Sequence, residues 1–259
     1  MPRLTILPIL AVIACGGSDT DTDAADSDSD VTNPLPAGID CVDEAPLTPT
    51  LTTDLFFGTV NLVGAGGGRE VEGALVELFD HSDPNTPVDS VTTAEDGLYE
   101  LEAPLGDAGW DGFLSIRATD MNPYTYRGTE PAVVGVENSP DLQNGVTWPN
   151  LHNDYGVEAL AGRALILFDQ KNCSGDWLAD AEISVEPSDA DTHVIYTRSD
   201  GPTDSTVTKR GTTYIFGVMP GEVTVSMSVD GAALVERTFS VEAESVNALV
   251  GGPQRTGSR

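Results

Sequence analysis

The residues able to do chemistry in this chain are mostly carboxylates. The 259 residues include 42 Asp and Glu against 12 Lys and Arg, with only three histidines and three cysteines. Asp19, Asp21 and Asp23 have the one-three-five spacing of a calcium loop, but Ala24 occupies the sixth position, where such loops need glycine. The glycine-rich run at 64–70 lacks the Lys-Ser/Thr end of a phosphate-binding loop. The scattered histidines match no metal spacing and no nucleophile–histidine motif. The sequence therefore predicts neither an enzyme nor a cofactor.

The charge of the chain restricts its partners. The formal net charge is −30. A surface this acidic repels phosphate backbones, so we expect no nucleic-acid partner. It also disfavours docking on anionic lipid through a basic patch.

An apolar run near the start of the chain ends at Cys15. The run, Leu4 to Ile13, is too short to span a bilayer, which needs about 20 apolar residues, but it suits a secretory signal. The residues Val12-Ile13-Ala14-Cys15 resemble a bacterial lipobox, with an aliphatic residue three positions before the cysteine and a small one just before it. That resemblance implies a signal peptide at 1–14, cleavage after Ala14, and a lipid anchor with palmitate-type chains on Cys15. The alternatives are an ordinary secretory signal that contains a cysteine, and a short core strand.

The segment after Cys15 is predicted to be a disordered acidic tether over 15–52. Six aspartates lie between Asp19 and Asp30 without a large apolar side chain among them, so this stretch cannot bury surface and repels itself. Gly16, rather than an aspartate, follows the cysteine. By the resemblance, this favours an outer-membrane lipoprotein of the cell envelope, and whether it faces the periplasm or the outside stays open.

Two further cysteines follow, Cys41 and Cys173. An exported protein meets an oxidising environment, so these two either form a disulfide or remain as separate thiols.

The body of the chain has the period-two pattern of half-buried strands. In "EVTVSMSV", Val223, Val225, Met227 and Val229 alternate with polar residues, and "ALVELF" and "LSIRAT" alternate in the same way. Turn signals such as Asp-Gly and Pro-Gly separate the runs. The sequence therefore predicts an all-β fold of antiparallel sheets.

The strands recur twice in the same order. "VEGALVEL…TTAEDGLYEL" in the first half parallels "LADAEISV…GTTYIFGVMPGEVTVSM" in the second. Both resemble the carboxypeptidase regulatory-like (transthyretin-like) family, which implies two tandem antiparallel β-sandwich domains and gives no information on function. The second copy departs from the pattern by a polar insert, 202–211. The predicted boundaries are domain 1 at 53–137, a linker at 138–157, domain 2 at 158–251 and a disordered tail at 252–259.

We expect a non-enzymatic binding or adhesion lipoprotein, held at the membrane by its lipid, that contacts an envelope protein or a glycan. The alternatives are a structural or assembly part of an envelope complex, and an accessory or degenerate hydrolase. Trp110 and Trp177 are candidate contact residues in loops, and Trp148 is a third candidate in the linker. For all three, packing at a domain edge is the other interpretation.

Overall fold

The computed structural model describes residues 38–63, 68–133, 136–137, 139–144, 147–198, 201–202 and 212–255. The predicted signal peptide, Ala14, Cys15, the acidic part of the tether and most of the 202–211 insert lie outside these ranges. The chain divides into two compact units, Met1–Pro34 and Leu35–Arg259, and every described residue belongs to the second. No helix within the described ranges is long and apolar enough to cross a membrane.

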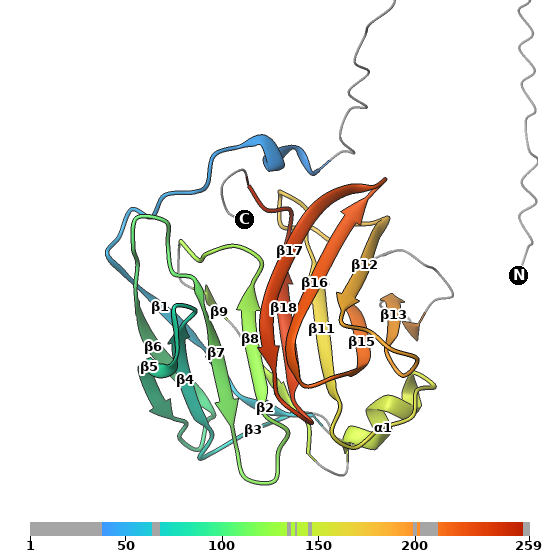
Figure 1. The fold of residues 1–259 in the computed structure, drawn as a ribbon. Helices are drawn as coiled ribbons and strands as arrows, with labels where there is room; N and C mark the ends of the chain where they lie inside the picture. Colours follow the sequence, from blue (N-terminus) through green and yellow to red (C-terminus); the bar gives the residue numbers. More distant parts are fainter. Residues whose placement is uncertain are drawn as a thin grey trace, which may run out of the picture. The chain divides into compact units, whose positions relative to one another are not determined.

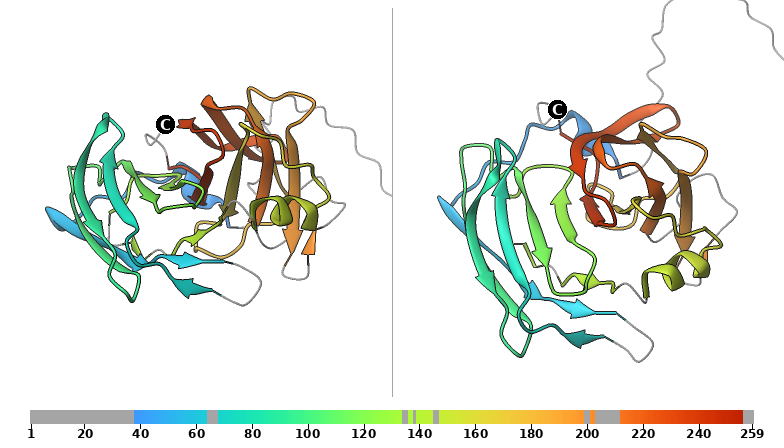
Figure 2. Two further views of the ribbon diagram at one scale, coloured as in Figure 1. Left: turned by 90° about the horizontal axis from the view of Figure 1, so that it is seen from below. Right: turned by 60° about the horizontal axis from the view of Figure 1, so that its bottom comes forward.

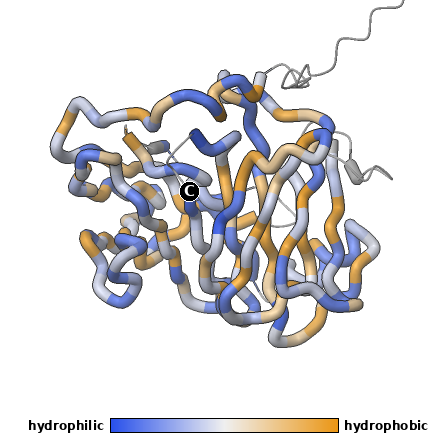
Figure 3. The backbone as a smooth tube through the Cα atoms, turned by 45° about the horizontal axis from the view of Figure 1, so that its top comes forward, coloured by the Kyte–Doolittle hydropathy of each residue, from blue (hydrophilic) through white to orange (hydrophobic). Residues whose placement is uncertain are grey.

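The second unit is built of strands, as the alternating pattern predicts (Figure 1). Figure 3 shows hydrophobic and hydrophilic residues alternating along them. Two helices are described, the 3-10 helix η1 (Asp40–Asp43) and α1 (Thr147–Asp154). The strands of the first module are β1 (Thr53–Thr59), β2 (Asn61–Leu62), β3 (Arg69–Glu70), β4 (Leu75–Asp80), β5 (Asp83–Thr92), β6 (Leu98–Pro104), β7 (Gly112–Arg117), β8 (Tyr124–Gly128), β9 (Val136–Glu137) and β10 (Asp141–Leu142). Those of the second module are β11 (Ala164–Gln170), β12 (Ala181–Glu186), β13 (His193–Arg198), β14 (Gly201–Pro202), β15 (Thr212–Val218), β16 (Gly221–Val229), β17 (Ala232–Val241) and β18 (Val246–Gly251).

The two modules repeat one pairing scheme. In the first, β1 pairs antiparallel with β6 and parallel with β9, while β4 pairs with β7 and β7 with β8. In the second, β11 pairs antiparallel with β15 and parallel with β18, while β12 pairs with β16 and β16 with β17. The fold is therefore the predicted pair of β-sandwiches. One strand departs: β5 pairs with β4, whereas its counterpart β13 pairs with β15.

The two sandwiches are joined directly, because β18 of the second module pairs with a strand of the first. β18 pairs in parallel with β8, in register from Val246 opposite Tyr124 to Val250 opposite Gly128. The result is one nine-stranded sheet in the order β14-β13-β15-β11-β18-β8-β7-β4-β5. Figure 2 shows the first-module strands on one side of this β8–β18 seam and the second-module strands on the other.

The two hydrophobic cores lie on opposite faces of the long sheet. Ala248 belongs to the core beneath β1 and β6, which we call the first core. Its neighbour Leu249 belongs to the core beneath β12 and β16, the second core. Successive strand residues point to opposite faces, so each small sheet covers a different face. One face of β4, β7 and β8 therefore carries no small sheet of its own module.

The segment predicted to be a linker is packed into the first core. The Asn144 side chain accepts a hydrogen bond from the Thr147 N–H at the start of α1 (2.9 Å), as a cap does. Trp148 and His152 are buried on one face of α1, and the His152 ring lies 4.8 Å from Phe216 of β15. The helix thus joins the first core to a strand of the second module.

Both ends of this unit are held more firmly than composition suggested. Ile39, within the predicted tether, is fully buried, and a disulfide joins Cys41 to Cys173. In the predicted tail, Gln254 is buried and donates its N–H to the Leu234 carbonyl (2.8 Å). Ile39 and Cys41 of the predicted tether and Gln254 of the predicted tail thus have specific partners, which composition alone does not indicate.

Candidate binding groove

The uncovered face of β4, β7 and β8 forms the floor of a groove whose wall is β17. We call it the inter-module groove; its volume is about 520 Å³. Phe79 and Phe113 are paired neighbours on β4 and β7, and their rings stack at 5.0 Å. Ser115 lies opposite Thr125 on β7 and β8 and continues the floor as a polar row. Phe239 lines the wall, but it is 3% exposed and packs into the core beneath β12 and β16.

Arg127 lies at one end of this floor. It is 4% exposed, and its guanidinium carbon lies 4.2 Å from the ring centre of Phe239 and 5.1 Å from that of Phe113. Such cation–π contacts stabilise the positive charge of the guanidinium. Its Nε has no hydrogen-bond partner among the described residues. Burial, and then Arg237, lower the pKa of Arg127 to about 9, so it remains charged at neutral pH.

Three further groups surround Arg127. Arg237 forms a short ion pair with Asp111, and the Nε of Arg237 also has no partner in the described ranges. His81 is nearby; burial, and then Arg237, lower its pKa. Two guanidinium groups thus share one carboxylate, Asp111, while His81 also lies near the carboxylate of Asp80. We call Arg127, Arg237, Asp111 and His81 the arginine cluster; it carries net positive charge in a strongly acidic protein.

The other end of the groove has the opposite character. Arg117 is paired there with Glu242 at 2.7 Å, and Glu222 also lines this end. Glu77 lies opposite Ser115 on the floor between the two ends. The groove therefore has an unpaired cation at one end and carboxylates along the rest.

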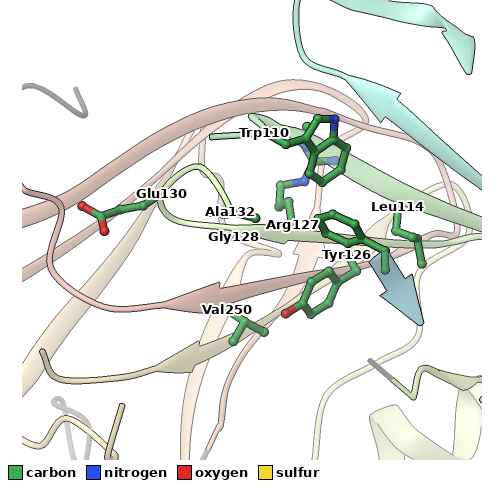
Figure 4. Close-up of a pocket in the computed structure, with 10 residues that line it drawn as sticks. Trp110, Leu114, Tyr126, Arg127, Gly128, Glu130, Ala132 and Val250 are labelled. Atoms are coloured by element: carbon green, nitrogen blue, oxygen red, sulfur yellow. The ribbon is translucent and has the colours of Figure 1, made fainter. Parts of the chain in front are cut away.

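A smaller cavity of about 190 Å³ lies on the other side of Arg127 (Figure 4). Trp110, Phe56, Leu114 and Tyr126 line it, so it is mainly apolar. Figure 4 shows Arg127 beside the Trp110 ring, and Glu130 pointing away from the cavity.

The structure separates the three tryptophans proposed as contact residues. Trp110 is 6% exposed and Trp148 8%, so the prediction of surface contacts is wrong for both. The backbone N–H and C=O of Trp110 both pair with Ala132, and its ring packs so closely on Gly112 that a Cβ there would lie 2.3 Å from the indole. The indole N–H itself has no partner in the described ranges. Trp177 is 39% exposed, with Lys171 Nζ 3.5 Å from its ring centre.

Sequence reasoning did not find the arginine cluster. The signal was the run "YTYRG": Tyr124 and Tyr126 alternate into the core, which places Thr125 and Arg127 on the opposite face. Nothing in the pattern showed that β17 would cover that face. Within the described residues, no three His, Cys, Asp or Glu gather as metal ligands would.

Comparisons with known proteins find similarity in structure only. The sequence matches no protein-family model and no curated protein. Among solved structures, the shaft pilin SpaA of Lactobacillus rhamnosus GG is 14% identical, with 78% of this chain and 98% of the pilin covered and a TM-score of 0.26. The minor pilin GBS52 of Streptococcus agalactiae is 9% identical, with 80% and 98% covered and a TM-score of 0.25. Superposition at this level is too weak to carry information on function.

Proposed function

We propose that this protein is a non-catalytic binding lipoprotein of the bacterial cell envelope. Its lipid would be attached at Cys15 after cleavage behind Ala14, and the acidic tether would hold the paired sandwiches away from the outer membrane.

The observation that carries the proposal is the β8–β18 seam. A ladder from Val246 to Val250 fixes the second module against the first, so the wall and the floor of the inter-module groove are held in place before any partner arrives. A ligand that binds a groove of fixed shape loses less free energy, because no loop or side chain of the groove has to be ordered on binding. Two independently moving domains would not keep such a site.

The test is crosslinking in intact cells with a tagged chain, followed by mass spectrometry of what is captured. Cys15→Ser should abolish capture of an envelope partner by removing the anchor. Thr125→Trp, which fills the groove floor, should abolish capture while leaving the protein at the membrane. Capture that survives Thr125→Trp would show that the groove is not the binding site.

The alternative is an assembly component that pairs through a strand edge. β12 is an edge of its three-stranded sheet, and an edge strand can accept a strand from a partner. Placing proline at Ser184 in the middle of β12 should disrupt that assembly, whereas Thr125→Trp should leave it intact. Glycan binding through an aromatic platform would instead require Trp177.

A further inference from the structure

We propose that the arginine cluster binds a carboxylate group, and that the apolar part of the same ligand lies against Phe79 and Phe113. This inference rests on the proposed function and names the class of ligand that the inter-module groove accepts.

The first step is the unpaired state of Arg127. A buried charge is normally paired and hydrogen-bonded, because removing it from water is costly. Arg127 is 4% exposed, forms no ion pair in the described part of the chain, and has an orphaned Nε. The one carboxylate of the cluster, Asp111, is already engaged by Arg237.

The second step is the geometry of a guanidinium. Its N–H donors lie in the plane of the group, whereas Phe113 and Phe239 contact Arg127 as cation–π partners. These contacts leave the Nε–H donor without a hydrogen-bond partner among the described residues. A carboxylate matches the N–H edge of a guanidinium with two parallel hydrogen bonds, which makes it the fitting acceptor.

The charges that line the groove exclude a ligand with several negative groups. Beyond the arginine cluster the groove presents Glu77, Glu222 and Glu242, and Arg117 is neutralised by Glu242. A second negative group on the ligand would meet these carboxylates, within a chain of net charge −30. The ligand therefore carries one anionic group at the Arg127 end.

The aromatic part of the groove floor indicates the chemistry of the rest of the ligand. Next to the cluster, the floor is the stacked pair Phe79–Phe113, and both rings are partly exposed. A groove of about 520 Å³ lies within the range of roughly 300–1,000 Å³ usual for small-ligand sites. An apolar or aromatic group joined to the carboxylate fits this surface.

The experiment is calorimetric titration of the purified full-length chain with benzoate, with benzamide as its uncharged counterpart and acetate as the acid without a ring. We expect saturable benzoate binding, at least tenfold weaker binding of benzamide, and weaker binding of acetate. Arg127→Met should weaken benzoate binding at least tenfold. Arg117→Met, which removes an arginine from the same groove, should change it less than threefold.

Two further measurements make the result specific. The Arg127 Nε–H resonance should shift on titration with benzoate, and Arg127→Lys, which keeps the charge but loses the planar fork, should bind more weakly than the native chain. N-acetylphenylalanine and its amide test the source of the carboxylate. Tighter binding of N-acetylphenylalanine than of benzoate indicates that the ligand is the carboxyl end of a peptide. Tighter binding of benzoate indicates a free organic acid.

Equal binding of benzoate and benzamide, unchanged binding by folded Arg127→Met, or no saturable binding of either acid would each overturn the inference. The proposed function fails separately. A partner captured through the groove without benzoate binding refutes only the carboxylate assignment, whereas benzoate binding without any captured partner refutes only the envelope-binding role.

Discussion

Removing the Cys41–Cys173 disulfide should destabilise the protein strongly. The two cysteines are separated by 132 residues. The chain-entropy relation gives about 5 kcal/mol at 25 °C for closing a loop of that length in the unfolded chain. Single domains are stable by only about 5–15 kcal/mol, so this loss is a large fraction of the total. At about 2–4 °C per kcal/mol for a body of this size, Tm should fall by roughly 10–20 °C.

The assay is urea unfolding followed by tryptophan fluorescence. The test protein carries Cys41→Ala and Cys173→Ala in a Cys15→Ser background, and the control carries Cys15→Ser alone, so neither sample has a free thiol. Because the uncrosslinked chain expands more on unfolding, the m-value should rise as the midpoint falls. A loss below about 1 kcal/mol with an unchanged m-value would refute the unfolded-state reasoning, and would mean that burial of Ile39 alone holds the segment in place.

Four other outcomes are expected. Trp148→Ala should cost about 3–5 kcal/mol, measured by urea unfolding, because it opens a cavity in the first core beneath α1. Burial lowers the pKa of His152, so the unfolded state binds the proton more tightly and stability should fall as pH drops below about 6.5. His152→Gln should reduce this pH dependence of thermal stability; the pKa of His81 is lowered in the same direction, so its contribution to the slope should remain. Arg127→Met should leave the free energy of unfolding unchanged or raise it, because a buried guanidinium without an ion pair in the described ranges is replaced by an apolar side chain; a clear loss of stability in urea unfolding would indicate a purely structural arginine. Trp177→Ala should change the free energy of unfolding by less than about 1 kcal/mol, since its ring is partly exposed and its main described contact is Lys171.

The strand pattern predicted the fold because alternation reflects burial directly. In β16 the residues Val223, Val225, Met227 and Val229 are all buried, as the sequence indicated. The repeat was readable for the same reason, since both copies must cover one face of each sheet. The sequence could not indicate which strands meet across the two copies, because hydrogen bonds between backbones leave little trace in side-chain type.

β18 shows this limit most clearly. Val246 and Ala248 face one core, Leu249 faces the other, and Asn247 lies in the groove floor. A strand buried on both faces has no alternation, so "VNALVG" predicts a central strand somewhere but names no neighbour. The groove depends on that neighbour, and this is why the arginine cluster was invisible while the strands themselves were not.

The repeat also raises the question of how the seam is confined to one pair of modules. β8 and β17 occupy equivalent places in their modules, so the edge that β8 offers to β18 has a counterpart at β17. Head-to-tail pairing of such edges between chains would produce an open filament rather than a closed oligomer. In the structure the edge of β17 is engaged by the chain's own end: Gln254 donates its N–H to the Leu234 carbonyl and accepts the Glu236 N–H on its Oε1 at 3.1 Å. Its amide also donates to the Thr129 carbonyl just beyond β8 (2.8 Å). One glutamine thus covers part of the exposed edge and ties it to the seam, so the edge pairing that joins the two modules is hindered from continuing into a third.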